Sequence, residues 1–232
     1  CEFCGFCETL VPCHRVLAGD TSACSGCGAC ALACPNEAIR MVESPRTRQV
    51  AIRVDGDRVS VPERITVKRA LELLGYSFGS MPAEGDLFAP CGVGGCWSCA
   101  VLIDGELRQS CVTTVRERME IMTRVPPSLP PRRSVHGWMG HAVGGVGTPW
   151  HLKSPAGFIE AAVFACGCNL RCPQCQNWRM AYSGVLPPLT AEEVLDLPGN
   201  TAALARVPDL FVFLSVSPET AKARLAGRQE PD

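Results

Sequence analysis

The sequence predicts a multidomain α+β protein of 232 residues, and three observations indicate this class. Sixteen cysteines, many in C-x2-C spacings, divide the chain into short motifs. In residues 49–124 apolar and polar residues alternate, except in one segment where the apolar residues have helical spacing. This pattern is typical of a small sheet with a single helix. A segment rich in proline and glycine, residues 125–150, separates this sheet from a final α/β portion, residues 151–232.

The cysteine content indicates either a secreted disulfide protein or a metal protein. The spacing favours metal, because disulfide frameworks usually hold shorter chains and no leader with a charged start and apolar core precedes the cysteines. We therefore expect a reducing, anaerobic cytoplasm. The chain starts at Cys1 inside a motif, so we expect it to be a fragment.

The charge and the apolar runs exclude two classes of partner. The net charge of -1 provides no general basic face for nucleic acid. The longest apolar run, Ala161 to Ala165, is too short to span a bilayer. We expect neither nucleic acid nor membrane as a partner.

The second cysteine group, Cys24-x2-Cys27-x2-Cys30-x3-Cys34-Pro35, has the spacing of the bacterial ferredoxin run that ligates 4Fe-4S cubes. Gly26 and Gly28 allow the backbone to fold closely around sulfur. A zinc knuckle is the alternative, but zinc ribbons use two pairs on either side of a longer loop. The spacing therefore predicts a 4Fe-4S site.

The first group repeats the triplet with a looser fourth member. It consists of Cys1, Cys4, Cys7 and Cys13. In two-cluster ferredoxins the fourth cysteine of each run serves the other cube, so Cys34 is a candidate partner of the first triplet and Cys13 of the second. His14 is an alternative ligand, although a surface histidine is the commoner case. Residues 1–48 are thus predicted to be a dicluster ferredoxin-like segment with two 4Fe-4S clusters.

Residues 49–124 are predicted to form two hairpins and a helix. The first hairpin has apolar residues at alternate positions from Val50 to Val61 and turns at Asp55-Gly56-Asp57. Thr66 is the expected N-cap of a helix that ends before Gly75. The second hairpin turns at Asp104-Gly105.

The same segment carries Cys91-x4-Cys96-x2-Cys99 and, beyond the second hairpin, Cys111. This is the plant-type 2Fe-2S spacing, and the glycines between the first two cysteines permit a loop whose amides point at sulfur. The region resembles the β-grasp ferredoxin domain of succinate dehydrogenase iron-sulfur subunits and molybdenum hydroxylases. That resemblance implies that all four cysteines bind a 2Fe-2S cluster. Trp97 replaces the small residue usual in the family.

Residues 125–150 show neither strand nor helix periodicity, so we expect a linker or an extended strap over a neighbouring domain. Arg132 and Arg133 are expected to be solvated. The histidines of this region lack the spacing of a metal site.

The last motif, Cys168-x3-Cys172-x2-Cys175, follows an apolar run, Phe158 to Ala165, which is predicted to be a buried strand of the parallel-sheet kind. Three thiolates leave one iron of a 4Fe-4S cube open to a ligand, so the motif indicates chemistry. A further electron-transfer cluster or a zinc knuckle is the alternative. Cys166 is either a fourth thiolate or a buried thiol at the strand end.

This motif resembles that of the radical S-adenosylmethionine enzymes of the activating-enzyme-like branch. The resemblance implies that the three cysteines are catalytic ligands of a 4Fe-4S cube whose open iron chelates S-adenosylmethionine. One electron then cleaves the sulfonium and yields a 5'-deoxyadenosyl radical. The resemblance also places three further residues at the cofactor: Gln174, Asn177 and Trp178. Gln174 stands where many family members have an aromatic residue.

The remaining chain is too short for the six strand-helix units of a partial barrel, so we expect an incomplete α/β radical S-adenosylmethionine segment over residues 151–232. It contains a predicted helix from Thr190 to Leu197 with Glu193 at the capping-box position. A strand, Leu210 to Val216, and a helix, Pro218 to Ala226, resemble the late strand and arginine-bearing lid of thymidylate kinases. The sequence has no Gly-x4-Gly-Lys-Ser/Thr loop, so kinase activity is not expected.

Two functions follow from these motifs. In the first, the upstream clusters relay electrons from a low-potential donor to a radical S-adenosylmethionine site, which acts on a substrate such as a glycyl radical enzyme. This fragment alone would be inactive, and a longer chain would complete the barrel. In the second, the chain is a multi-cluster electron carrier of the dehydrogenase-subunit type. A carrier closes every iron with a protein ligand, whereas the enzyme leaves one open.

Overall fold

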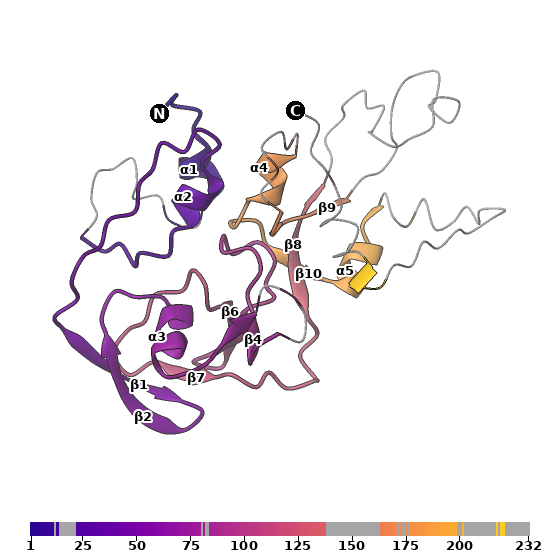
Figure 1. The fold of residues 1–232 in the computed structure, drawn as a ribbon. Helices are drawn as coiled ribbons and strands as arrows, with labels where there is room; N and C mark the ends of the chain where they lie inside the picture. Colours follow the sequence, from indigo (N-terminus) through magenta and orange to yellow (C-terminus); the bar gives the residue numbers. More distant parts are fainter. Residues whose placement is uncertain are drawn as a thin grey trace, which may run out of the picture.

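The protein is an α+β molecule in which a small N-terminal segment and a short C-terminal sheet lie beside a central five-stranded sheet (Figure 1). The computed structural model describes residues 1–11, 13, 22–79, 81, 84–137, 163–170, 172, 175, 177–198, 201, 217 and 219–220. The predicted strand 210–216 and all but Glu219 and Thr220 of the final predicted helix lie outside these residues.

The central sheet contains both predicted hairpins. Its strand order is β2-β1-β7-β5-β6. The strands are β1 (Gln49–Val54), β2 (Asp57–Pro62), β5 (Ala100–Ile103), β6 (Glu106–Gln109) and β7 (Glu120–Met122). β1 pairs antiparallel with β2 and parallel with β7, and β5 pairs antiparallel with β6 and with β7. A second, two-stranded pair joins β3 (Phe78–Gly79) to β4 (Leu87–Phe88) in parallel.

Helix α3 (Val67–Leu73) supplies the other half of this domain's core. The Thr66 side chain accepts a hydrogen bond from the Arg69 amide, which confirms the predicted N-cap, and Gly75 has the positive φ of 96° expected beyond a helix end. The apolar face of the helix packs on alternate residues of the sheet in one buried cluster. Hairpin, helix and strand order agree with the expected β-grasp arrangement.

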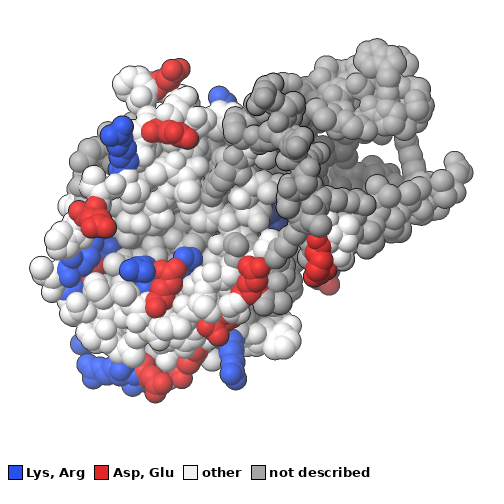
Figure 2. All heavy atoms as spheres, in the orientation of Figure 1, with Lys and Arg blue, Asp and Glu red and all other residues white. Residues whose placement is uncertain are grey.

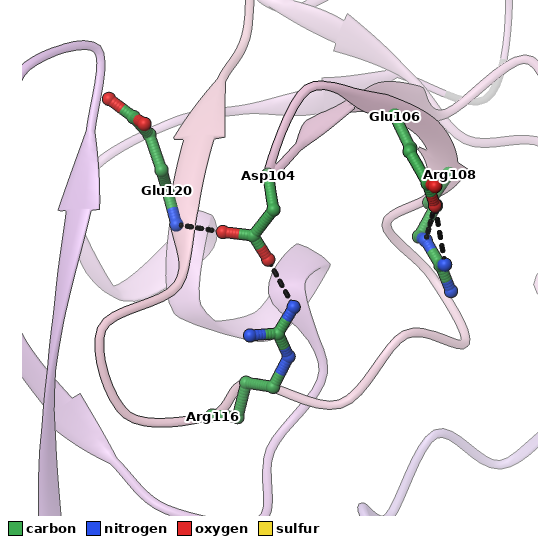
Figure 3. A network of polar contacts seen from close by, with 5 residues as sticks. All are labelled: Asp104, Glu106, Arg108, Arg116 and Glu120. Atoms are coloured by element: carbon green, nitrogen blue, oxygen red, sulfur yellow. Dashed lines mark hydrogen bonds and ion pairs between the residues drawn. The ribbon is translucent and has the colours of Figure 1, made fainter.

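Asp104 fastens the second hairpin to the centre of the sheet. It has a φ of 52° in the β5–β6 turn, and its carboxylate accepts hydrogen bonds from the Glu120 amide at 2.9 Å and from the Arg116 guanidinium (Figure 3). Glu106 and Arg108 form a separate ion pair on β6. The turn that precedes Cys111 is therefore held to β7, which helps to fix the position of this cysteine.

The N-terminal segment contains two short helices, α1 (Phe6–Thr9) and α2 (Ala29–Ala33). Each follows a glycine in the left-handed region, Gly5 with φ 73° and Gly28 with φ 75°, where a residue with a Cβ would be strained. The two helices therefore start immediately beside cysteines of the first and second groups. The segment repeats one local fold, as the repeated cysteine triplet predicts.

The C-terminal sheet has three strands in the order β10-β8-β9. They are β8 (Arg132–Gly137), β9 (Val163–Ala165) and β10 (Pro188–Thr190), and both pairings are antiparallel. The prediction of a buried strand of the parallel-sheet kind is therefore wrong for its described end, and Ala165 is exposed. The partner strand is β8, which lies inside the predicted linker. Its pairing with residues about thirty positions away follows from long-range contacts, which local periodicity does not report.

Two helices complete the described part of this region. α4 (Trp178–Ala181) follows the third cysteine motif, and α5 (Ala191–Leu195) follows β10. Thr190 and Glu193 form the predicted capping box, although the helix ends two residues before Leu197. The described residues contain no parallel strand–helix–strand barrel unit here. None of the described helices has the length and apolar character that crossing a membrane requires.

Candidate metal centres

Four buried cysteines gather beside α3 and the second hairpin. Cys91, Cys96, Cys99 and Cys111 are each at most 5% exposed, and all are free thiols. Hydrogen bonds from the Cys111 and Cys96 thiols hold the pKa of Cys91 well below its ordinary value, and the same contact with Cys91 raises the pKa of Cys111. Hydrogen bonds link Cys91 to Cys96 and to Cys111, and Cys99 to Cys111, so the four sulfurs lie close together and away from water, which suits a cluster that binds thiolates.

The backbone around these sulfurs provides N–H donors. The amides of Val93 and Cys96 donate hydrogen bonds to the Cys91 sulfur. Gly94 and Trp97 have φ values of 90° and 59°, in the left-handed region that turns successive amides to one side of a loop. The buried Ser110 hydroxyl has no partner at ordinary hydrogen-bond distance among the described atoms, but it lies close enough to the Cys99 sulfur to lower the pKa of that thiol. A buried hydroxyl donor beside these sulfurs fits a bound group that carries acceptor sulfurs.

A pocket of about 220 Å³ in the N-terminal segment brings together the first cysteine triplet and the last cysteine of the second group. Its lining includes Cys1, Cys4, Cys7 and Cys34. The Cys34 sulfur accepts a hydrogen bond from the Ala38 amide at 3.4 Å. The pocket is mostly apolar apart from these sulfurs, and it offers the four soft donors of a cubane cluster.

The remaining four cysteines of this segment form a second group. Burial raises the pKa of Cys27 and of Cys30, and the charges of Cys13 and Cys24 raise both further, so the four sulfurs lie within electrostatic range of one another. The Cys24 sulfur accepts a hydrogen bond from the Gly26 amide at 3.4 Å. This group differs from the pocket-lining set Cys1, Cys4, Cys7 and Cys34, and the crossed ligation of two cubes stays a prediction.

The third motif forms a loop between β9 and α4. Cys172 is exposed, and Cys168 and Cys175 are partly exposed. The Leu170 amide donates to the Cys168 sulfur at 3.3 Å, and the Cys175 amide donates to the Cys172 carbonyl at 3.2 Å. The loop is fastened at its start because Cys168 and Gly167 both donate backbone hydrogen bonds to the Ala181 carbonyl.

Cys166 differs from these three cysteines in its burial. It is fully buried, packs against Gly95, and lies near Cys91. Burial raises the pKa of its thiol to about 11, although the nearby Arg133 acts in the opposite direction. This environment favours a neutral buried thiol over a thiolate ligand.

Arg133 is a residue whose role the sequence analysis missed. Arg133 is exposed, as expected, but its guanidinium also donates hydrogen bonds to the carbonyls of Cys166 at 3.0 Å and Gly167 at 3.1 Å. The sequence does not predict these bonds because the partners are backbone carbonyls about thirty residues away, which no local spacing reveals. An arginine fork that holds two successive carbonyls fixes the entry to the cysteine loop.

The residues predicted to contact S-adenosylmethionine fall into two groups. Gln174 lies outside the described residues. Asn177 precedes α4 without a side-chain capping bond, and the Trp178 ring packs on Phe6 with centroids 4.5 Å apart. Trp178 thus contributes to packing against the N-terminal segment, and its contact with a cofactor stays a prediction.

The cysteine sites meet around one buried apolar cluster. Residues of the N-terminal segment, of the Cys91–Cys96 loop and of α4 belong to it, including Phe6, Ala29, Val93 and Ala181. A cavity of about 850 Å³ between the first two regions is lined by Cys27, Cys91 and Cys111. Cysteines of the 4Fe-4S and 2Fe-2S motifs therefore line the same cavity.

The described side chains contain no group of three or more His, Cys, Asp or Glu residues placed to hold a single metal ion. Cluster ligands differ from single-ion ligands because irons and inorganic sulfides lie between the cysteine sulfurs, and each cysteine of a cube binds a different iron.

Residues 47–126 match the family model of a 2Fe-2S iron-sulfur cluster binding domain, and residues 18–40 match that of a 4Fe-4S binding domain. The chain carries iron–sulfur electron-transfer modules. Both predicted types of ferredoxin module are confirmed by these matches, which end before the third motif. No curated protein matches the chain.

The two modules contact each other directly. Leu32, two residues after Cys30 on α2, lies so close to the loop between Cys91 and Cys96 that a Cβ on Gly92 would come within 2.8 Å of its Cδ1. Leu32 is the link between the modules that sequence reasoning missed, because an apolar residue on a short helix carries no signal of its partner.

Proposed function

We propose that this chain is the electron-supplying part of a radical S-adenosylmethionine enzyme, in which a third cluster held by Cys168, Cys172 and Cys175 receives electrons from the ferredoxin modules. The observation that carries the proposal is the position of the third cysteine loop. It packs against the 2Fe-2S domain at Gly95 and Cys96 and against the N-terminal segment at Phe6.

The donor set supports a cluster with one open iron. The three motif cysteines are at least partly exposed, whereas Cys166, the nearest candidate for a fourth thiolate, is fully buried against the 2Fe-2S loop. When bound, such a cluster would supply one electron to the sulfonium of S-adenosylmethionine. The chain's own residues hold the loop: Arg133 binds its entry carbonyls, and the Tyr182 hydroxyl donates to the Leu170 carbonyl at 3.0 Å.

Upstream, we propose two 4Fe-4S cubes with crossed ligands and one 2Fe-2S cluster, within domains that span residues 1–48 and 49–124. The third site would belong to residues 151–232, with β8 of the preceding strap completing its sheet. The first cube takes Cys1, Cys4, Cys7 and Cys34, which line one pocket. The second takes Cys13, Cys24, Cys27 and Cys30.

The partners of this assembly would be a low-potential one-electron donor and a substrate that a carbon-centred radical attacks, such as a glycyl radical enzyme. On the face in Figure 2, acidic and basic side chains are interspersed and neither sign gathers into a patch. A donor that docked on this face would meet mixed charges and not a field of one sign.

The decisive experiment is anaerobic reconstitution followed by electron paramagnetic resonance with and without S-adenosylmethionine. We expect the signal of the third cluster to change on addition of S-adenosylmethionine, and Cys172→Ser to remove that signal while the 2Fe-2S signal persists. A third signal that does not respond to S-adenosylmethionine would mean that the chain is a multi-cluster electron carrier. Cys166→Ser tests ligation directly, and we expect iron content to stay the same.

A further inference from the structure

The third cysteine loop touches the 2Fe-2S loop at two glycines, Gly167 and Gly95. A Cβ atom on Gly167 would lie 2.3 Å from the amide nitrogen of Cys96 and 2.5 Å from its Cβ. Real Cβ atoms do not approach so closely, so only glycine permits this separation. Cys96 is one of the four cysteines of the 2Fe-2S domain, and Gly167 directly precedes Cys168.

The contact is reciprocal. A Cβ on Gly95 would lie 2.2 Å from the Ser183 carbonyl oxygen, 2.9 Å from the Cys166 Cβ and 3.0 Å from the Gly167 amide nitrogen. The two loops therefore cross at Gly95 and Gly167, where backbone atoms and the Cβ atoms of Cys96 and Cys166 make the contact. We call this crossing the glycine junction.

One residue of β8 locks the glycine junction in place. The Ser134 amide donates a hydrogen bond to the Gly95 carbonyl at 3.1 Å. The Ser134 carbonyl accepts a hydrogen bond from the Cys166 amide at 2.9 Å. Its hydroxyl accepts a hydrogen bond from the Trp97 indole at 3.1 Å. Ser134 is fully buried, so each of these bonds is protected from water. The separation of the two loops is thus determined by a rigid hydrogen-bonded seam.

We propose that the glycine junction is the path by which an electron passes from the 2Fe-2S site to the third site. The inference rests on the proposed function in one respect, namely that the third motif holds a cluster. The transfer moves one electron from the reduced 2Fe-2S centre, which returns to its all-ferric state, to the oxidised cube; no bond is made or broken and no proton moves. Dithionite, a low-potential one-electron reductant, then reduces the 2Fe-2S centre again.

A second contact, between Phe6 and Trp178, also reaches the third site, but more atoms separate the candidate ligands along this route. Phe6 lies between Cys4 and Cys7 and touches Trp178, which is three residues beyond Cys175. Two side chains and a helical turn separate the candidate ligands on that route. At the glycine junction a ligand residue, Cys96, is itself in contact with the neighbour of Cys168. Because tunnelling falls off exponentially with separation, the glycine junction is the dominant route.

The test compares glycine variants in the full chain without S-adenosylmethionine. Gly167→Ala places a Cβ against Cys96, and Gly95→Ala places one against Ser183 from the other loop. Gly105→Ala is the matched control for Gly167→Ala, because Gly105 has a φ of 83° close to the 80° of Gly167, but a Cβ there meets nothing within 4 Å. Each variant is reduced anaerobically with dithionite, freeze-quenched and measured by electron paramagnetic resonance and iron analysis.

In the freeze-quench time course of the unmodified chain we expect the third cluster to be reduced after the 2Fe-2S centre. Gly167→Ala and Gly95→Ala should slow this second step severalfold while iron content holds, and Gly105→Ala should leave its rate unchanged. If either variant loses iron, the rate in the other variant, compared with that of the unmodified chain, decides the result. The inference is overturned if the third cluster of the unmodified chain is reduced before or independently of the 2Fe-2S centre, or if an iron-replete Gly167→Ala reduces it at the unmodified rate. Absence of iron from the third motif would overturn both the inference and the proposed function, whereas an iron-replete third cluster whose signal does not respond to S-adenosylmethionine would overturn only the proposed function.

Discussion

The rings of Phe6 and Trp178 pack against each other with centroids 4.5 Å apart and planes inclined by 50°. Phe6 belongs to the first cysteine run and Trp178 to the helix after the third motif, so this pair joins the two ends of the proposed electron path. Phe6 is 3% exposed, which makes the contact part of a core.

The first prediction concerns this pair. Trp178→Ala should lower the free energy of unfolding by about 1–3 kcal/mol, because aromatic packing and buried area are lost, whereas Trp178→Phe should cost less than about 1.5 kcal/mol. Anaerobic urea denaturation measures both. Arg179→Ala, which removes only a cation–π contact on the same ring, is the control. A Trp178→Phe variant of unchanged stability that binds S-adenosylmethionine more weakly would assign the ring to the cofactor instead.

The second prediction tests the bond between Trp97 and Ser134. Ser134→Ala should destabilise the protein by about 1–3 kcal/mol, because the Trp97 indole and the Leu186 carbonyl both lose a buried partner. Trp97→Phe should cost about 1 kcal/mol plus the lost ring area. A double-mutant cycle should give a coupling of about 0.5–1.5 kcal/mol. Strictly additive effects would show that the bond does not hold the seam.

The third prediction concerns Arg133. Lysine keeps the charge but cannot reach both carbonyls as a planar fork, so Arg133→Lys should loosen the entry to the third motif at a cost of about 1–3 kcal/mol. We expect faster loss of iron from the third cluster to a chelator, with the ferredoxin modules unaffected. Arg132→Lys, on the exposed neighbouring residue, should change nothing. Equal rates in the two variants would contradict the assignment.

The fourth prediction separates crossed from uncrossed ligation. In the crossed scheme Cys34 and Cys4 hold the same cube, so a Cys34→Ser, Cys4→Ser double variant should lose about four irons, as each single variant does. Cys34→Ser with Cys27→Ser should lose about eight. Iron analysis after anaerobic reconstitution measures this directly. The reverse pattern would mean that Cys34 serves the cube of its own run.

The fifth prediction concerns Asp55, whose carboxylate accepts hydrogen bonds from the Thr123 amide and hydroxyl and from the Tyr76 hydroxyl. Burial acts to raise its pKa, but these hydrogen bonds outweigh it, so the pKa lies below its ordinary value. A depressed pKa stabilises the fold above the unfolded value and ceases to do so as pH falls through the folded value.

Asp55→Asn should therefore lower the free energy of unfolding by about 1 kcal/mol or less, given the exposure of the site. Asparagine tolerates the positive φ of 51° at this turn, so the backbone is not strained. The difference should be constant between about pH 6 and 8, because the carboxylate is fully ionised there. Denaturation of both chains at the two pH values measures it, and a marked change across this range would contradict the assignment.

Much of the 2Fe-2S domain follows from local pattern. Alternation from Val50 to Val61, the Asp-Gly turns and the Thr66 cap each specify structure within a few residues, and each is confirmed. The cysteine spacings likewise identify both ferredoxin modules, because a cluster requires sulfurs at separations that short loops alone can deliver.

The C-terminal region was harder to predict for the opposite reason. The strand from Arg132 to Gly137 has no period-two pattern, and its structure comes from pairing with β9 and β10. Arg133 and Ser134 gain their roles from backbone groups far along the chain. Proline and glycine content reports a lack of local preference, and it does not report which distant strand the segment joins.

By itself, the sequence determined what the protein can bind, because iron–sulfur ligation depends on residue type and close spacing, both of which are local. Only the tertiary structure decided how the sites are connected. The approach of Gly167 to Cys96, the burial of Cys166 and the lock at Ser134 are contacts between segments roughly thirty to seventy residues apart. Such contacts form when whole surfaces pack, so no window of sequence contains them.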